Sequence, residues 1–100
     1  MKHSIKVQGN QALIFLTDKI YVHDASVLRE EVLEVIDHGV TDIKIDLSGL
    51  TYIDSSGLGT LVKINKTAKE RNGKLVLTGA RGLPEELLKR TRLDKVFTIE

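Results

Sequence analysis

The chain has 100 residues, of which 41% are hydrophobic and 29% are charged, and this fits one small domain spanning residues 1–100. A chain of this size hides only about 60–70% of the surface that its unfolded form exposes, which argues against a deep substrate cavity. Lys and Arg number 15 against 14 Asp and Glu, so the formal charge is +1. Direct binding to nucleic acid or to a membrane surface through a general electrostatic field is therefore not expected.

The chain has no cysteine, which excludes disulfides, thiol nucleophiles and thiolate metal sites. A cysteine-free chain suits a reducing compartment. The first seven residues lack a continuous apolar run of signal-peptide length, and no stretch approaches the roughly 18 apolar residues that cross a bilayer. The sequence predicts a soluble, cytoplasmic protein.

Two apolar-rich runs open the chain, at residues 5–7 and 12–16, and Gly9-Asn10 lies between them. This pattern predicts a β-hairpin whose second strand is the more buried. From Asp24 onward the apolar residues recur every three or four positions until Gly39. This spacing predicts an amphipathic helix with Asp24 as its N-cap and Gly39 as its C-terminal stop.

Residues 43–47 alternate between apolar and polar side chains, which predicts a strand that ends at Ser48-Gly49. A second helix is expected after Asp54, because apolar residues between 58 and 68 share one helical face. Asn72-Gly73 is expected to close that helix.

The remaining elements are a short strand at 75–77, a helix whose first turn contains Pro84, and a last strand at 96–99. The order is β-β-α-β-α-β-α-β. Strands separated by helices favour parallel pairing with right-handed crossovers. The expected fold class is therefore α/β, with a mixed, mostly parallel sheet and an N-terminal hairpin.

The densest chemical signal is the segment Asp54 to Gly59, in which small polar residues and two glycines lie between a strand and a helix. Free backbone N–H groups and the helix dipole at such a junction favour an anion such as phosphate. The structural alternative is that Asp54 or Ser55 is an ordinary N-cap.

Three catalytic interpretations fail on spacing. A nucleophile elbow requires Gly-x-Ser-x-Gly, but Ile53 or Asp54 occupies the place of the first glycine. The phosphate-binding loop of nucleotide hydrolases requires a lysine that the run at residues 57–60 lacks. The three histidines, at positions 3, 23 and 38, share no ligand spacing. The sequence therefore predicts a protein that is not an enzyme, with no catalytic residue, no metal and no cofactor.

The string Asp54-Ser55-Ser56-Gly57-Leu58-Gly59, placed after a strand, resembles the signature of STAS domains, specifically of bacterial anti-sigma factor antagonists. The resemblance covers nearly the whole chain, because the hairpin, the helices and the later strands fall in the family's order. It implies a STAS fold over residues 1–100.

The resemblance also implies a function. By position, Ser55 corresponds to the serine that is phosphorylated by a partner which is both a serine kinase and an anti-sigma factor. Ser56 takes the family's second Ser/Thr position and Asp54 its acidic position. The unphosphorylated protein would bind the anti-sigma factor and release a sigma factor, phosphorylation would end this binding, and a separate protein phosphatase would restore it. The implied partner surface is the whole run from Asp54 to Gly59, Leu58 included.

One segment departs from the family. The family usually has Gly-x-Leu/Ile-Asp between the second strand and the first helix, whereas this chain has Asp18-Lys19-Ile20-Tyr21. Tyr21 thus occupies the acidic position, either as a half-buried loop aromatic or as part of the partner surface. Asp24 could supply the missing carboxylate if the loop folds back.

The alternative function is a STAS scaffold that binds another protein without phosphorylation, in a stress-signalling assembly or a transport system. The sequence leaves the oligomeric state open, because an edge strand can pair with a second copy.

Overall fold

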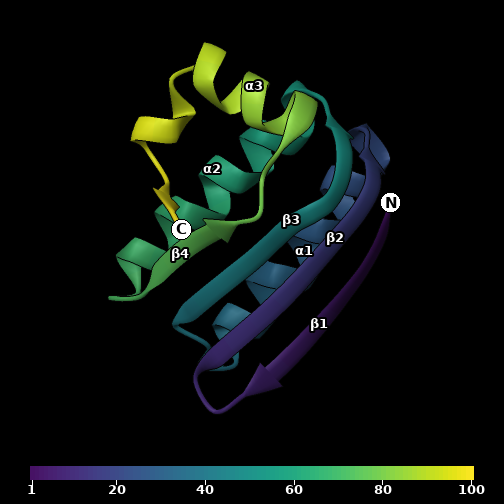
Figure 1. Ribbon diagram of the computed structural model, residues 1–100. Helices are drawn as coiled ribbons and strands as arrows, with labels where there is room; N and C mark the ends of the chain where they lie inside the picture. Colours follow the sequence, from purple (N-terminus) through teal and green to yellow (C-terminus); the bar gives the residue numbers. More distant parts are fainter.

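A five-stranded sheet with helices packed against it forms the computed structural model, which describes residues 1–100 (Figure 1). In chain order the elements are β1 (Lys2–Gln8), β2 (Gln11–Ile20), α1 (Val22–Asp37), β3 (Asp42–Ile53), α2 (Ser55–Glu70), β4 (Lys74–Thr78), α3 (Gly82–Arg90), the 3-10 turn η1 (Leu93–Lys95) and β5 (Thr98–Ile99). The strands lie in the sheet in sequence order. β1 is antiparallel to β2 and every other neighbouring pair is parallel. The predicted α/β class, element order and mixed sheet are confirmed.

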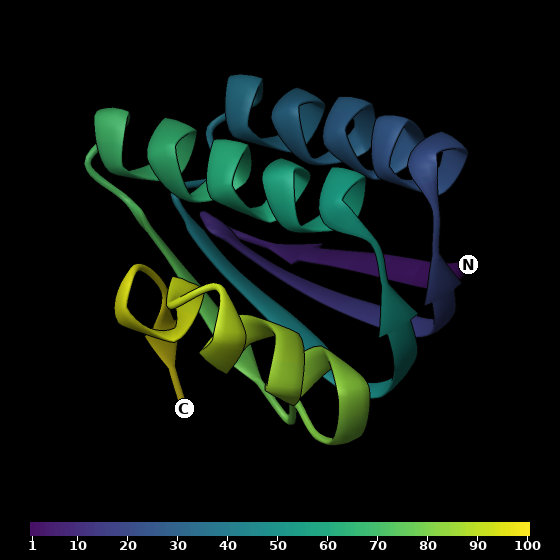
Figure 2. The same cartoon turned by 90° about the horizontal axis from the view of Figure 1, so that it is seen from above.

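α1 and α2 form a layer on one face of the sheet. Figure 2 shows α1 and α2 side by side and running in the same direction, with α3 outside that layer, beyond the strands. The core lies between this layer and the sheet. Its largest fully buried side chains are Ile14, Leu16, Ile20, Leu28, Ile43, Ile45, Leu47, Ile53, Leu61, Ile64, Leu75 and Leu77. The longest helices have 16 residues each, and none combines the length and the apolar character needed to cross a membrane.

The N-terminal hairpin follows the prediction. Gln8 pairs with Gln11, so the turn consists of Gly9 and Asn10. Gly9 has φ of 63°, which a glycine adopts without steric cost. β2 alternates buried and half-buried residues over most of its length, whereas β1 has no buried residue and forms an edge of the sheet.

α1 begins earlier than predicted. Its N-cap is Tyr21, and the N-cap assigned to Asp24 is wrong because Asp24 lies in the first turn, three residues further on. The Asp24 carboxylate accepts a hydrogen bond of 3.0 Å from the Tyr21 backbone N–H. An acidic side chain in the first turn that accepts a hydrogen bond from the N-cap backbone N–H stabilises the start of the helix. The predicted stop is confirmed, since the helix ends at Asp37 and Gly39 has φ of 103°.

β3 is longer than predicted. It continues through Ser48 and Gly49 to Ile53, so the expected end at this dipeptide is wrong. The pairing of β2 with β3 shifts register twice, and β3 thereby uses two more residues than β2 over the paired length. A Cβ on Gly49 would lie 2.6 Å from the Thr17 Cγ2 atom, so the missing side chain permits close approach of the two strands.

The irregular stretch is held by a local hydrogen bond. The Asp46 carboxylate accepts a hydrogen bond of 2.8 Å from the Ser48 N–H. Hydrogen bonds from Ser48 hold the pKa of Asp46 below its ordinary value. Ser48 and Gly49 therefore mark an irregularity within a strand, which sequence alone does not distinguish from a turn.

The chain after β4 differs in one detail from the prediction. Pro84 lies in the first turn of α3, as expected. The last strand contains only Thr98 and Ile99, so Val96 and Phe97 lie outside it. Phe97 is nevertheless buried in the core. Its apolar character reflects packing beside η1 rather than strand pairing.

Asp18 has φ of 70°, a left-handed conformation that costs a non-glycine residue free energy. We predict that Asp18→Gly raises the free energy of unfolding by up to about 1 kcal/mol, and the melting temperature by a few degrees. The substitution keeps the hydrogen bond from Thr51, because Thr51 donates to the backbone carbonyl of Asp18 and not to its side chain. Thermal denaturation followed by circular dichroism measures the effect.

The matched control is Lys19→Gly, one residue further on, where φ is not positive. This change should lower the melting temperature, since glycine in an ordinary strand conformation adds only unfolded-state entropy. A lower melting temperature for Asp18→Gly would contradict the prediction.

Candidate functional site

The site lies where the carboxyl ends of two parallel strands meet. Ile20 at the end of β2 pairs with Ile53 at the end of β3, and the Asp54 N–H donates a hydrogen bond of 3.2 Å to the Ile20 carbonyl. α1 begins at Val22 and α2 at Ser55. The N-termini of two helices therefore lie next to each other at one edge of the sheet (Figure 2), and both present partial positive charge there.

Asp54 is the N-cap of α2. Its backbone is extended, with φ of −90° and ψ of −179°, and its carboxylate accepts a hydrogen bond of 3.0 Å from the Gly57 N–H. Of the two candidate caps, the structure selects Asp54. Ser55 is consequently the first residue of the helix.

The Ser55 side chain is exposed, and that of Ser56 is half-buried. Neither hydroxyl takes part in a hydrogen bond within the chain, whereas the neighbouring Asp54 side chain does. The Ser55 hydroxyl is thus free to react. A dianion attached to it would lie at a helix N-terminus, where backbone N–H groups lack intrahelical partners.

Gly57 and Leu58, both predicted as partner-binding residues, are buried. A Cβ on Gly57 would lie 2.5 Å from the Ile53 Cγ1 atom and 2.9 Å from the Ile20 Cγ2 atom. The glycine therefore lets the first turn of α2 pack directly against the ends of β2 and β3. Gly59, by contrast, is exposed, and a Cβ there would meet nothing within 4 Å.

Tyr21 is 51% exposed and lies beside Tyr52 of β3, with ring centroids 5.5 Å apart and an angle of 41° between the ring planes. Val22, the next residue, is 67% exposed. We refer to Tyr21, Val22 and Tyr52 as the aromatic patch. The sequence predicts a role for Tyr21 but not for Tyr52, because the strand that carries Tyr52 was expected to end at Ser48-Gly49.

Asp24 supports the start of α1. Besides the Tyr21 N–H, its carboxylate contacts the amino group of Met1 at 3.4 Å. The hydrogen bond from Tyr21, the largest contribution, lowers the pKa of Asp24 despite some burial, and the Met1 amino group adds to the effect. No hydrogen bond or ion pair joins Asp24 to α2. The Asp24 carboxylate therefore stabilises the start of its own helix.

Comparison with known proteins agrees with this geometry. The chain belongs to the STAS domain family, whose family model matches residues 2–100. Asp18, at the glycine position of the family's usual loop motif, has the positive φ that glycine favours.

Two relatives from different bacteria have the same description. The chain is 34% identical over 73 residues to the anti-sigma-B factor antagonist of Bacillus subtilis, a match that covers 73% of this chain and 66% of the relative. It is 33% identical over 89 residues to the anti-sigma-B factor antagonist of Listeria monocytogenes, covering 87% of this chain and 76% of the relative.

Solved structures share the fold. The phosphorylated form of SpoIIAA, a Bacillus cell fate determinant, superposes with a TM-score of 0.81 at 17% identity and covers 99% of this chain and 91% of that one. The unphosphorylated form of SpoIIAA, an anti-sigma factor antagonist, also has a TM-score of 0.81. At this identity the similarity establishes the fold.

The two glycines of α2 should respond oppositely to the same substitution. Gly57→Ala should lower the free energy of unfolding by about 1–3 kcal/mol, because its methyl group would collide with Ile20 and Ile53. Gly59→Ala should raise it by about 0.5–1 kcal/mol, because alanine is the better helix former at an exposed position. Urea denaturation measures both values. Equal effects of the two substitutions would show that Gly57 has no special packing role.

Proposed function

We propose that this chain is an anti-sigma factor antagonist controlled by phosphorylation of Ser55. In the unphosphorylated state it binds an anti-sigma factor that is also a serine kinase, and a sigma factor is released. Phosphorylation of Ser55 ends the binding, and a separate protein phosphatase restores it. All of this takes place in the cytoplasm. The observation that most directly supports this proposal is the exposed Ser55 hydroxyl, which makes no hydrogen bond within the chain and lies where two helix N-termini meet.

The names of the relatives support this assignment. Two relatives with at least 33% identity are described as anti-sigma-B factor antagonists. SpoIIAA, a protein of the same fold, has been solved both with and without phosphate. The chain matches about two thirds of the length of the Bacillus subtilis relative, so the partners are inferred from the site as well as from the names.

The local physics suits a switch at Ser55. A phosphate adds about −1.5 to −2 charges, and a helix N-terminus stabilises such an anion. The same charge lies next to the Asp54 carboxylate, which already accepts the Gly57 N–H. Phosphorylation therefore changes the charge and the size of this surface without requiring the core to rearrange. A partner that packs closely on the unmodified surface is then repelled.

The chain itself is a substrate in this scheme and not a catalyst. The Ser55 oxygen attacks the γ-phosphate of ATP, the hydroxyl proton passes to a base, and ADP leaves. The nearest carboxylate in sequence, that of Asp54, is occupied in capping α2. The base, the metal ion and the nucleotide site would all belong to the kinase partner.

Incubation with the cognate kinase and ATP tests the assignment. The wild-type protein should gain the mass of one phosphate, and Ser55→Ala should gain none. Ser56→Ala is the matched control and should still be phosphorylated, because Ser56 is the less exposed serine. Intact-mass analysis with site mapping reads the result. Phosphate on Ser55→Ala, or on Ser56 alone, would overturn the assignment.

The same experiment distinguishes the phosphorylation switch from a second candidate function, a binding scaffold that is not phosphorylated. The aromatic patch favours this alternative, since Tyr21 occupies the family's acidic position and half of its surface is open to a partner. A wild-type protein that binds its partner tightly but accepts no phosphate would establish the scaffold.

The partner surface should include Gly59. Gly59→Arg places a large charged side chain in open space one turn from Ser55, so the fold should persist while the partner's affinity falls by about tenfold or more, roughly 1.4 kcal/mol. Glu70→Arg introduces the same side chain at the exposed far end of α2 and is the control. Calorimetric titration with the partner measures both affinities. If Gly59→Arg binds like the control, the interface lies elsewhere.

A further inference from the structure

A hollow lies at the opposite end of the sheet from Ser55. It has a volume of about 430 Å³ and is bordered by the starts of β2, β3 and β4, at Gln11, Asp42 and Lys74. Parallel strands place their amino ends together, so this hollow and the Ser55 site are at opposite edges. Its volume falls within the range of roughly 300–1,000 Å³ that is usual for small-molecule sites.

The strand register places the lining side chains on the helix-free face. Lys6 of β1, Leu13 of β2 and Lys44 of β3 form one row across the sheet. The neighbours of Leu13 on its own strand, Ala12 and Ile14, are buried beneath the helices, so Leu13 points to the other side. In Figure 1 no helix lies in front of this part of the sheet.

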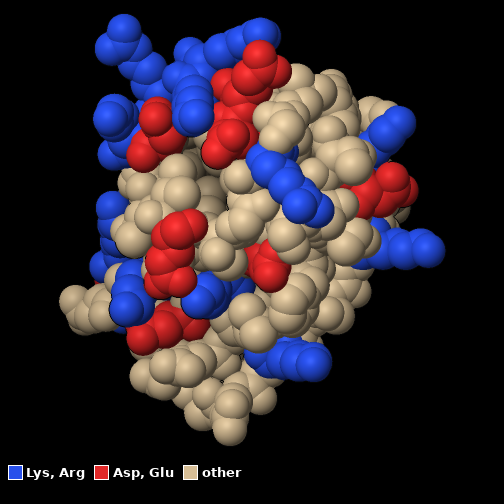
Figure 3. Space-filling view, in the orientation of Figure 1, with Lys and Arg blue, Asp and Glu red and all other residues tan.

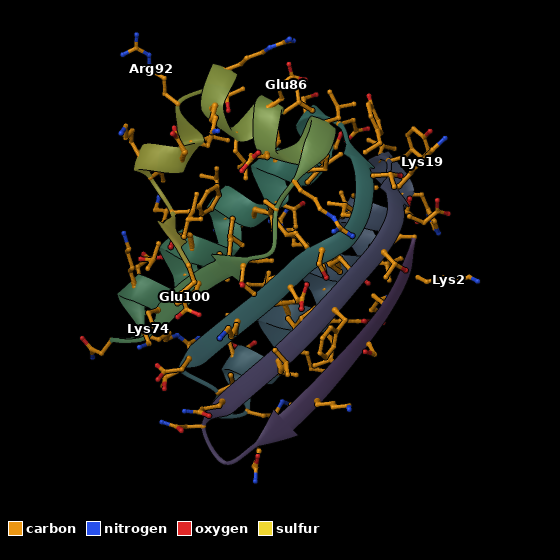
Figure 4. The ribbon with its side chains drawn as sticks, in the orientation of Figure 1. Lys2, Lys19, Lys74, Glu86, Arg92 and Glu100 are labelled. Atoms are coloured by element: carbon orange, nitrogen blue, oxygen red, sulfur yellow. The ribbon has the colours of Figure 1, made fainter.

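Three lysines line the hollow, together with the side-chain carboxylates of Asp42 and Glu100. The Lys44 Nζ atom lies 2.8 Å from the Glu100 Oε1 atom, while Lys6 and Lys74 make no ion pair. Figure 4 shows Lys74 and Glu100 close together at this end of β4. In the space-filling view, basic (blue) and acidic (red) side chains are mixed over the face of the molecule that carries no α1 or α2 (Figure 3).

The carboxylate of Glu100 is an anionic group that Lys44 already binds. Its hydrogen bond with Lys44 lowers the pKa of its carboxyl group, and the charge of Lys74 adds to the effect. The main chain of Glu100 is held separately, since its N–H donates a hydrogen bond of 2.9 Å to the Leu77 carbonyl. The side chain can therefore leave without unpairing the strand. The ion pair is about half exposed on both sides, and such pairs contribute little to stability.

We propose that this hollow binds a small organic anion with an apolar body, whose anionic group displaces the Glu100 carboxylate from Lys44 and also binds Lys74. The apolar body would lie on Leu13, and the amide groups of Gln8 and Gln11 would border it. Glu100 acts as an internal competitor for the anion.

The fluorescent anion 1-anilinonaphthalene-8-sulfonate is a suitable probe, and N-phenyl-1-naphthylamine is its neutral counterpart with a similar aromatic frame. Titration of the folded chain at low salt should give saturable binding of the sulfonate and much weaker binding of the neutral compound. Backbone amide shifts in NMR spectra should map the sulfonate to Lys6, Leu13, Lys44 and Glu100.

Substitutions on the two sides of the ion pair should act in opposite directions. Lys44→Gln and Lys74→Gln should each weaken sulfonate binding by about fivefold or more, whereas Glu100→Gln should tighten it, because the competing charge is removed. Lys66→Gln, an exposed lysine of α2 outside the hollow, is the control and should change nothing. Circular dichroism checks the fold of each variant.

Three results would overturn the proposal. These are equal binding of the neutral compound, amide shifts confined to the Ser55 end of the molecule, and a Glu100→Gln variant that binds the sulfonate no more tightly than the wild type.

Discussion

The parallel pairing of β2 with β3 places Ile20 beside Ile53, and the functional end of the molecule depends on this pair. Because both strands finish together, α1 and α2 begin together, and their N-termini meet at one edge of the sheet. The two isoleucines also form the surface onto which Gly57 packs. The position of Ser55 at the start of α2 follows from this packing and from the cap supplied by Asp54.

The strand ends coincide only because the pairing is irregular. Each of the two register shifts adds one residue to β3 relative to β2. Asp18 in its left-handed conformation and Gly49 with its close approach to Thr17 lie at this irregular stretch. A regular ladder would place Thr51 of β3, two residues earlier in the chain, beside Ile20. The irregular stretch therefore determines that Ile20 and Ile53 lie side by side at the site.

The molecule separates residues that hold the site from residues that a partner can reach. Gly57 and Leu58 are buried, and Asp54 and Asp24 cap helices, whereas Ser55, Gly59 and the aromatic patch are accessible. A modification of Ser55 would therefore change the surface that a partner contacts and leave the buried and helix-capping residues in place. The lysine-lined hollow lies at the other end of the same strands, so an anion bound there need not compete with a partner at Ser55.

Local signals in the sequence determined the element order, the hairpin turn at Gly9, the start of a helix after Asp54 and the family to which the chain belongs. These features depend on the periodicity of apolar residues and on capping and turn residues close together in the chain. That Ser55 accepts phosphate remains a prediction. Only the tertiary structure decided the full length of β3, the contact of Tyr21 with Tyr52, the steric need for Gly57 and the lysine-lined hollow. Each of these depends on the register between strands or on packing between segments distant in sequence, which no local pattern specifies.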